Sequence, residues 1–246
     1  MTIKAVFFDA AGTLMRTRAR VGETYARIAA KHGKTVSPVE LSHRFRVCFT
    51  AAPRLAFPGA AEESICALER DWWKDLVSEI FQPWTPFENF EDYFIELFEH
   101  FASYEAWVLY PEALDTLLEL KRRGLILDVI SNFDSRLIGI LAGLGVRPLF
   151  DHVFLSSRVG YAKPDAQIFR AALRQHGLKP AEALHVGDNQ LCDLQGADQA
   201  GLWAVLIDRD SEAKDFGPER IDNLRVILRL LEDPLTGSFD LIRRLR

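Results

Sequence analysis

Apolar residues form a short run at the start of the chain, and this run stops at an acid. Residues 3–8 are rich in Val and Phe, and they precede Asp9, small residues, Gly12 and Thr13. A run of this length predicts a buried strand rather than a helix. Asp9 is then expected at the carboxyl end of the strand, where open α/β sheets bind ligands. The alternative is that Asp9 only caps the next turn.

The apolar positions change to helical spacing after this strand. The pattern predicts helices over residues 20–33, 60–81 and 87–102. A further helix is expected from Ser37, because the sequence Ser-Pro-Val-Glu supplies a cap, a proline at the first position and an acid at the third. The sequence shows no strand pattern between these helices. We therefore expect an all-helical cap domain inserted at about residues 17–105.

Strand and helix patterns alternate from residue 111 onward. Strands are expected over residues 125–131, 151–156, 183–187 and 203–207, and helices over residues 111–123, 135–143, 166–176 and 218–232. This alternation predicts an α/β fold with a doubly wound parallel sheet. Residues 1–16 and 106–246 would form this core, with the helical domain inserted between them.

Composition and charge narrow the class of protein. The chain has 246 residues, enough for one large or two modest domains, and its net charge of −5 disfavours nucleic acid as a partner. Three cysteines without metal-type spacing favour reduced thiols. The sequence shows neither a secretory signal nor an apolar run long enough to span a bilayer. We therefore expect a cytoplasmic protein without a membrane partner.

Polar residues follow two of the later strands at positions that suit a phosphate. Ser131 and Asn132 end one strand, and their hydroxyl and amide groups can donate hydrogen bonds to phosphoryl oxygens. Lys163 precedes a helix and can neutralise an anionic substrate as well as the carboxylate of Asp9. The alternatives are an ordinary helix cap for Ser131-Asn132 and a surface loop for the lysine.

A third strand ends in a cluster of oxygen ligands. Gly187 is followed by Asp188, Asn189 and, shortly after, Asp193. Mg²⁺ is usually held by one or two carboxylates together with water and substrate phosphate, which suits Asp9 paired with Asp188. Two acids brought next to Asp9 would repel one another strongly without a cation. The alternative is that Asp188 or Asn189 caps a helix.

These residues together resemble the haloacid dehalogenase-like hydrolase superfamily. Its four motifs occur in order as Asp9 to Thr13, Ser131, Lys163, and Gly187-Asp188 with Asp193. The resemblance covers nearly the whole chain and implies a Rossmann-like core with a helical cap. Three further segments are similar to the group of haloacid dehalogenase-like hydrolase domain-containing protein 3, namely Val21 to Glu23, Trp72-Trp73 and Ser131 to Asp134.

The resemblance implies a role for each site residue. Asp9 is the nucleophile and a Mg²⁺ ligand, and the main-chain carbonyl of Ala11 is a second ligand. Asp188 is a further ligand, supported by Asn189 or Asp193. The implied substrate is a small phosphorylated molecule, whose phosphoryl group lies beside Gly12 and Thr13 and is bound by Ser131, Asn132 and Lys163.

Ala11 departs from the pattern of the family phosphatases, which carry a second Asp two residues after the nucleophile. That Asp protonates the leaving oxygen and then activates water, and general acid–base catalysis of this kind gives about 10²- to 10⁴-fold in rate. Four hypotheses are compatible with the absence of this second Asp: a slow or leaving-group-restricted phosphatase, a 2-haloacid dehalogenase, a phosphonoacetaldehyde hydrolase-like enzyme, and a non-catalytic phosphate-binding protein. The dehalogenase branch does without a metal, so Asp188 and Asp193 count against it. We favour the phosphatase.

The helical domain holds the candidates for substrate recognition. Lys31, Lys34 and Lys74 are candidates for the Schiff base that a phosphonoacetaldehyde hydrolase needs. Arg16, Arg18 and Arg20 lie where the chain leaves the core and are candidates for binding an anionic substrate, or simply for a solvated hinge. The aromatic stretch from Trp72 to Phe94 either lines a pocket or forms the bundle core, and its helical spacing favours the core.

Overall fold

A parallel sheet with β1 at its centre forms the core of the protein. The computed structural model describes residues 2–209 and 219–232. Six strands pair in the order β5-β4-β1-β6-β7-β8, and every neighbouring pair is parallel. Their bounds are β1 (Ala5–Phe8), β4 (Ile126–Ser131), β5 (His152–Leu155), β6 (Ala183–Gly187), β7 (Trp203–Ile207) and β8 (Arg220–Ile221).

Helices cover both faces of this sheet. Val6 and Phe8 pack in one apolar cluster with helices α5 (Ala113–Arg122), α6 (Arg136–Gly143) and α10 (Arg225–Leu230). Ala5 and Phe7 point to the other face, where they pack with α8 (Ala166–His176) and α9 (Gly196–Gln199). Because β1 is buried on both sides, its sequence is apolar throughout rather than alternating. The predicted doubly wound α/β fold is confirmed.

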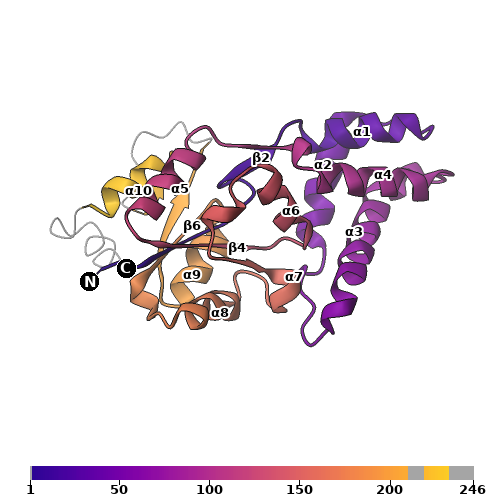
Figure 1. The fold of residues 1–246 in the computed structure, drawn as a ribbon. Helices are drawn as coiled ribbons and strands as arrows, with labels where there is room; N and C mark the ends of the chain where they lie inside the picture. The colour runs from indigo at the N-terminus through magenta and orange to yellow at the C-terminus, as the bar shows by residue number, and fades with distance from the viewer. Residues whose placement is uncertain (1, 210–218, 233–246) are drawn as a thin grey trace.

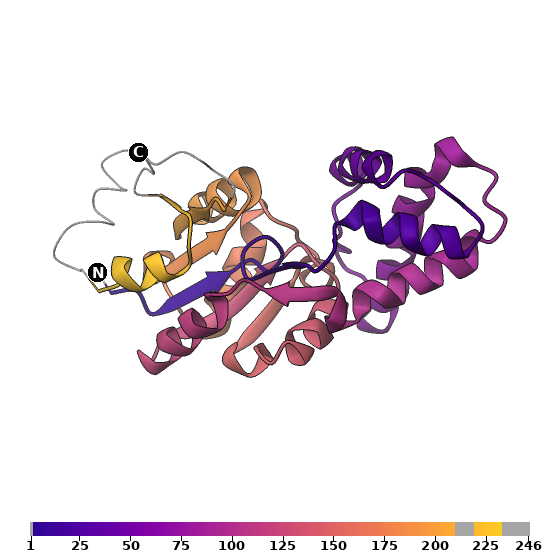
Figure 2. The same cartoon turned by 90° about the horizontal axis from the view of Figure 1, so that it is seen from above.

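Four helices form a second body at one end of the molecule (Figures 1 and 2). They are α1 (Val21–Lys31), α2 (Pro38–Ala51), α3 (Ile65–Phe81) and α4 (Phe90–Ala102), and we call residues 21–102 the helical cap. The cap has its own apolar cluster around Tyr93 and Phe81, against which Trp84, Phe87 and Phe90 pack. Much of the aromatic stretch is therefore bundle core, as its spacing favoured.

Two short strands that the sequence did not predict connect the cap to the core. β2 (Met15–Thr17) and β3 (Trp107–Leu109) pair antiparallel, so both connections between the two bodies run side by side. Arg18 donates hydrogen bonds to the carbonyls of Glu105 and Trp107, and Arg16 donates to that of Thr17. In this structure both arginines thus bind the connecting backbone rather than standing ready for a substrate.

The end of the described chain differs from the expected helix over 218–232. Residue 218 lies outside the described residues. Arg220 and Ile221 form β8 and pair with β7, so the helix α10 covers only Arg225–Leu230.

The predicted start of the helix at Ser37 is also found in the structure. Ser37 occupies the N-cap position of α2, but its side chain makes no capping hydrogen bond.

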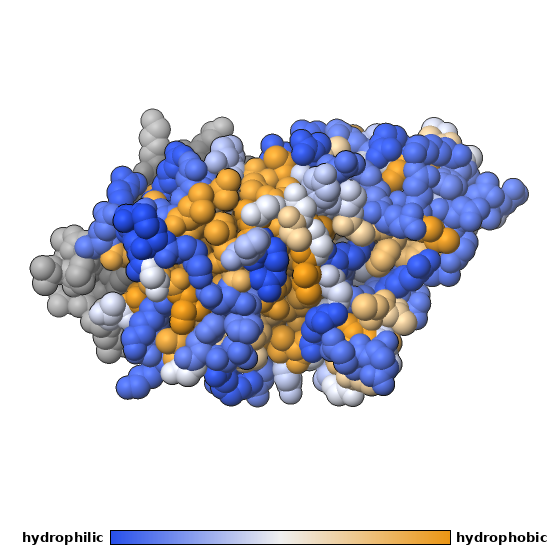
Figure 3. All heavy atoms as spheres, viewed as in Figure 1, coloured by the Kyte–Doolittle hydropathy of each residue, from blue (hydrophilic) through white to orange (hydrophobic). Residues whose placement is uncertain are grey.

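The two bodies differ in the polarity of their surface. Figure 3 shows apolar side chains gathered over the core on this face, whereas hydrophilic side chains dominate the helical cap. Exposed apolar residues of the core helices include Leu114 and Leu118 on α5 and Ile138 on α6. Within residues 2–209 and 219–232, no helix combines the length and apolar character that crossing a membrane requires.

Candidate active site

Asp9 lies directly after β1, at the point where the strand order reverses between β4 on one side and β6 on the other. Its backbone N–H donates to the carbonyl of Val186 at 2.9 Å, and the residue is only 7% exposed. Ser131 Oγ and Lys163 Nζ both donate to Asp9 Oδ1, at 2.9 and 2.7 Å. Among the described residues, no group donates to Asp9 Oδ2. The carboxylate is thus oriented by one oxygen and open at the other.

Lys163 bridges two carboxylates in the interior. Its Nζ lies 2.5 Å from Asp193 Oδ1 in addition to its contact with Asp9, and the residue is 2% exposed. Burial alone would lower the pKa of Lys163, but the charges of Asp193 and Asp9 outweigh it and raise the pKa above the ordinary value. The lysine therefore carries a positive charge next to the oxygen of Asp9 that it binds.

Asp193 uses its oxygens to hold this arrangement together. Besides Lys163, Oδ1 contacts His185 Nε2 at 2.9 Å, and Oδ2 accepts the backbone N–H of Asn189 at 3.0 Å. Burial would raise the pKa of Asp193, yet Lys163 and His185 lower it below the ordinary value. Both oxygens of Asp193 thus bind protein donors in this structure, so the side chain positions Lys163 and the loop after Asp188. The prediction that Asp193 supports a metal stays a prediction.

Asp188 approaches the turn that follows Asp9 very closely. A Cβ on Gly12, whose φ is +89°, would overlap the Asp188 carboxylate. A Cβ on Gly187 would likewise overlap the carboxylate of Asp193. Thr13 is fully buried, and its hydroxyl lies 3.5 Å from Asp188 Oδ1, at the outer limit of a hydrogen bond. The two glycines are therefore required because acids pack directly against their backbone.

Three carboxylates meet at this edge of the sheet. One oxygen each from Asp9, Asp188 and Asp193 can be chosen so that all lie within 4.8 Å of one another. Although Asp188 is exposed on its outer side, loss of water around its carboxylate, followed by the charges of Asp9 and Asp193, raises its pKa to about 7. Burial also raises the pKa of Asp9. The raised pKa values of Asp9 and Asp188 show that their negative charges repel one another and lack water, a situation that a hard cation with oxygen ligands would relieve.

Two asparagines near the site bind backbone groups of the protein. Asn132 donates through Nδ2 to the carbonyl of Lys163 and accepts the N–H of Lys163 through Oδ1, at 2.9 and 2.7 Å. Asn189 Oδ1 accepts the backbone N–H groups of Leu191 and Cys192, and so caps the π-helix Gln190–Gln195. In this structure Asn132 thus holds the backbone of Lys163, and Asn189 caps the π-helix; their predicted roles toward a phosphate and a metal stay predictions.

Arg209 supports the turn after Asp9, and sequence reasoning missed it. It follows β7 and donates to the carbonyls of Gly12 and Thr13, at 3.3 and 2.7 Å. Glu112 binds the same guanidinium at 2.6 Å. Burial alone would raise the pKa of Glu112, but the hydrogen bond from Arg209 lowers it below the ordinary value. The sequence carried one signal for Arg209, namely a charged residue shortly after the buried strand β7. It carried a similar signal for His185, which is a single polar residue in the otherwise apolar strand β6.

Comparison with known sequences identifies the family to which these motifs belong. The sequence profile of the haloacid dehalogenase-like hydrolases matches residues 3–201. The chain belongs to this family. The match includes β1 and the strand ends that carry Asp9, Ser131 and Asp188.

Curated relatives in this family include the group that three segments of the sequence had suggested. The human haloacid dehalogenase-like hydrolase domain-containing protein 3 is 38% identical over 230 residues, which cover 90% of this chain and 85% of the relative. That prediction is confirmed. A phosphoserine phosphatase of Thermus thermophilus is 42% identical over 127 residues, which cover 51% of this chain and 50% of the relative.

Solved structures of haloacid dehalogenase-like hydrolases share the fold. The putative hydrolase YfnB of Bacillus subtilis, determined bound to magnesium, has a TM-score of 0.75 at 16% identity and covers 94% of this chain and 100% of its own. L-2-haloacid dehalogenase of Xanthobacter autotrophicus has a TM-score of 0.70 at 19% identity, covering 95% and 100%. At these identities the similarity establishes the fold alone.

The cap lysines that a Schiff-base mechanism would use are all paired within the helical cap. Lys31 contacts Glu96 at 2.5 Å and Lys74 contacts Glu91 at 2.6 Å. Lys34 donates to the carbonyls of Trp84 and Pro86, at 2.7 and 2.6 Å. Each ammonium is therefore engaged by the cap itself, which leaves the phosphonoacetaldehyde hydrolase hypothesis without a candidate amine among these three.

Proposed function

We propose that this protein is a Mg²⁺-dependent phosphohydrolase that cleaves a small phosphate monoester through an aspartyl-phosphate at Asp9. The observation that carries the proposal is the state of the Asp9 carboxylate. Ser131 and Lys163 hold Oδ1, while Oδ2 has no donor among the described residues. A nucleophile needs one oriented, unblocked oxygen, and an adjacent cation to hold the anionic phosphoryl group.

The first half-reaction forms a covalent intermediate. Asp9 Oδ2 attacks phosphorus, the new P–O bond forms, and the bond between phosphorus and the alcohol oxygen breaks. Lys163 stays charged beside the transferring group and offsets its negative charge, while Ser131 is placed to donate to a phosphoryl oxygen. The departing alkoxide takes its proton from water, because Ala11 offers no acid.

The second half-reaction returns Asp9 to its starting state. Water attacks the phosphorus of the aspartyl-phosphate, the acyl phosphate bond breaks, and inorganic phosphate and the Asp9 carboxylate are released. A neighbouring Asp would normally take the proton of this water, but Ala11 stands in that place. We therefore propose slow turnover, with the strongest dependence on leaving groups that depart without a proton.

We propose Mg²⁺ as the cofactor, bound by Asp9, Asp188 and the main-chain carbonyl of Ala11. The three crowded carboxylates and the raised pKa of Asp188 support this set, because a cation would remove the repulsion between them. When bound, Mg²⁺ would screen charge on the transferring phosphoryl group. Asp193 and Asn189 would support this site by holding Lys163 and the loop after Asp188.

A cytoplasmic location fits the same proposal. Cys48, Cys66 and Cys192 are all free thiols in the structure, as expected for a reducing compartment.

The proposal is tested by comparing wild type with Asp9→Asn, using phenyl phosphate and excess Mg²⁺. We expect the variant to lose turnover, because an amide does not attack phosphorus, and we expect chelation to abolish wild-type activity. Asp71→Asn, an exposed acid on α3, is the matched control and should retain full activity. Retained turnover in Asp9→Asn, or full activity after thorough chelation, would contradict the proposal.

A further inference from the structure

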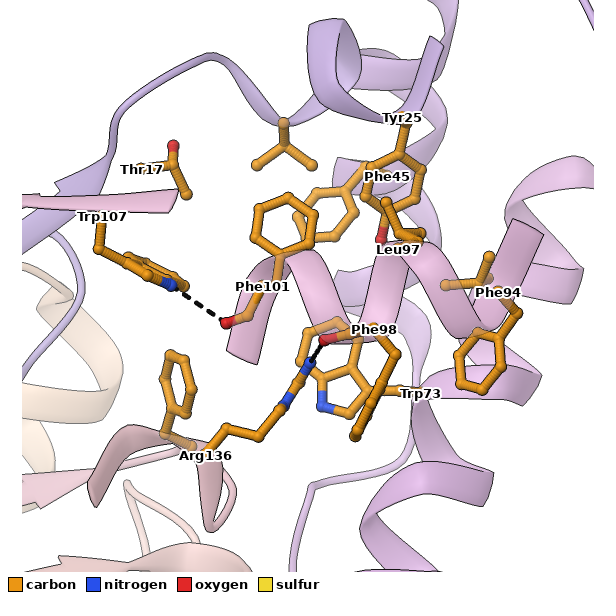
Figure 4. Close-up of a pocket in the computed structure, with 13 residues that line it drawn as sticks. Thr17, Tyr25, Phe45, Trp73, Phe94, Leu97, Phe98, Phe101, Trp107 and Arg136 are labelled. Atoms are coloured by element: carbon orange, nitrogen blue, oxygen red, sulfur yellow. Dashed lines mark hydrogen bonds between the residues drawn. The ribbon is translucent and has the colours of Figure 1, made fainter. Parts of the chain in front are cut away.

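A cavity of about 80 Å³ lies between the helical cap and the core (Figure 4). All four cap helices contribute to its walls, and most of the contributing side chains are aromatic or branched aliphatic. The core side consists of Thr17, Trp107, Phe133 and Arg136. We call this space the aromatic cavity. Its volume is several times the roughly 10–15 Å³ that one water needs, and apolar cavities bind apolar molecules in preference to water.

The aromatic cavity begins where the loops of the candidate active site meet the cap. Phe133 lies two residues after Ser131, whose hydroxyl binds Asp9. Thr17 ends β2, and β2 is tied to the turn after Asp9 by the hydrogen bond from Gly12 N–H to the carbonyl of Met15. Both loops that flank the nucleophile therefore run directly from the site to the cavity wall. The cavity is therefore connected to the candidate active site through these two short stretches of chain.

Arg136 gives the cavity no free positive charge. Its guanidinium donates to both oxygens of Asp134, at 2.9 and 2.6 Å, and to the carbonyl of Phe98 at 3.2 Å. It also stacks over the Phe98 ring, 3.9 Å from the centroid. With three of its N–H donors bound and its charge balanced by the buried carboxylate of Asp134, Arg136 acts as a wall of the cavity. A second anionic group on the substrate would find no partner here.

Tyr25 brings a hydroxyl to the wall of the cavity. The residue is 2% exposed, and among the described residues its hydroxyl has no hydrogen bond and is not one of the fully buried side-chain atoms that lack a partner. In Figure 4 its ring points from α1 into the space beside Leu97 and Phe45. The hydroxyl therefore reaches the space of the cavity, where a ligand or water can satisfy it.

We propose that the aromatic cavity binds the alcohol part of the substrate, and that this part is a compact apolar group of about one ring. The Tyr25 hydroxyl would bind a single polar atom on it. This inference rests on the proposed function, because it places the phosphoryl group at Asp9. It predicts a phosphate monoester of an apolar alcohol, rather than a sugar phosphate or a substrate with a second anionic group.

The test compares two substrates with similar leaving groups. Benzyl phosphate and ethyl phosphate both release primary alkoxides, so their difference in kcat/KM reports the cavity rather than the chemistry. We expect wild type to prefer benzyl phosphate by about tenfold or more, the range for added apolar contact in a pocket. Val77→Phe, which fills the cavity, should remove this preference by lowering kcat/KM for benzyl phosphate more than for ethyl phosphate. Val47→Phe makes the same change on the exposed face of α2 and should keep the preference.

Binding of benzyl alcohol, followed by ligand-observed NMR, separates failure of this inference from failure of the proposed function. It needs neither metal nor turnover. Binding to wild type and Val47→Phe but not to Val77→Phe would support the cavity even for a protein without phosphatase activity. Equal binding to all three proteins, or an unchanged benzyl preference in folded Val77→Phe, would overturn the inference. Should Val77→Phe fail to fold, Leu97→Phe fills the same cavity from α4 and takes its place.

Discussion

Ala11 stands at the position from which an acid would serve both halves of the proposed reaction. It is half-buried, and it lies in the turn whose carbonyls Arg209 fixes one and two residues further along. The surrounding groups are in place: Lys163 is charged, Ser131 is hydrogen-bonded to Asp9, and Asp188 lies against the same turn. The absence of a proton donor at this one residue is therefore the reason why we propose slow turnover.

Restoring that donor gives a direct prediction. Ala11→Asp should increase kcat/KM for an alkyl phosphate by about 10²-fold or more, because a basic alkoxide needs a proton to leave. An aryl phosphate should gain much less in its first step, since phenolate departs readily. Ala11→Asn matches the shape of the side chain without its acid and should give no gain. A folded, metal-binding Ala11→Asp without a preferential alkyl gain would count against the missing-donor hypothesis.

Single residues also show where sequence reasoning reached its limit. Strand ends correctly bring Asp9, Ser131 and Asp188 to one edge, because the carboxyl ends of parallel strands meet there. The backbone partners of Asn132 could not be predicted in this way, whereas helix capping by Asn189 was one of the alternatives that the sequence left open. An amide binds whatever donor or acceptor the local loop presents, and here the loops present the backbone of Lys163 and a helix end.

Helix α3 ties the cap to the core through buried polar contacts. Glu69 accepts hydrogen bonds from the N–H and hydroxyl of Ser135, at 3.0 and 2.8 Å, and from the hydroxyl of Ser157 at 2.6 Å. Trp73, one turn further along the same helix, donates to Asp134 Oδ2 at 2.6 Å. These contacts hold the cap against the loops after β4 and β5. At the scale of elements, they fix where the aromatic cavity lies relative to Asp9.

Removing the acceptor should loosen this junction measurably. In Glu69→Ala the N–H of Ser135 loses its partner, and an unsatisfied buried donor costs about 1–3 kcal/mol. We therefore expect amide hydrogen exchange at Ser135 to accelerate about ten- to a hundredfold, while exchange in the core of α8 stays unchanged. Glu63→Ala removes an exposed acid nearby and is the control. Unchanged exchange at Ser135 in Glu69→Ala would show that the contact does not hold the junction.

The elements that escaped prediction are those formed by long-range pairing. β2 and β3 contain three residues each. They are strands only because they pair with each other, with Arg16 opposite Val108, although the whole cap separates them in the sequence. β8 is likewise a strand only because it pairs with β7, and its residues lie within the range for which the sequence predicted a helix. Long amphipathic helices and apolar strands were predictable because their patterns are local.

The molecule as a whole concentrates negative charge at its catalytic edge. An acid whose pKa is higher in the folded protein binds more protons when folded, so the free energy of unfolding falls as pH rises between the two pKa values. For Asp188 this window runs from 3.8 to about 7. Without a cation, ionised Asp188 should therefore destabilise the fold at and above neutral pH.

The charge on Asp188 predicts that wild type and Asp188→Asn exchange their order of melting temperature when Mg²⁺ is added. In chelator at pH 8, Asp188→Asn should melt at a higher temperature than wild type, and the difference should vanish toward pH 4. With excess Mg²⁺ the order should reverse, because the metal binds and stabilises wild type more than the variant. Asp222→Asn, an exposed acid in the core, should behave like wild type in both conditions. The same order of melting temperatures with and without Mg²⁺ would argue against Asp188 as a metal ligand.

The proposed mechanism requires that Asp9 becomes phosphorylated, and trapping the covalent intermediate would reveal this. Wild-type protein turning over phenyl phosphate with Mg²⁺ is quenched in acid and reduced with borohydride, which converts an aspartyl-phosphate to homoserine. Peptide mass spectrometry should then find homoserine at position 9 in wild type, and neither homoserine nor phosphate release in Asp9→Asn. Phosphate release by wild type with unmodified Asp9, or with the modification at another acid, would contradict the account.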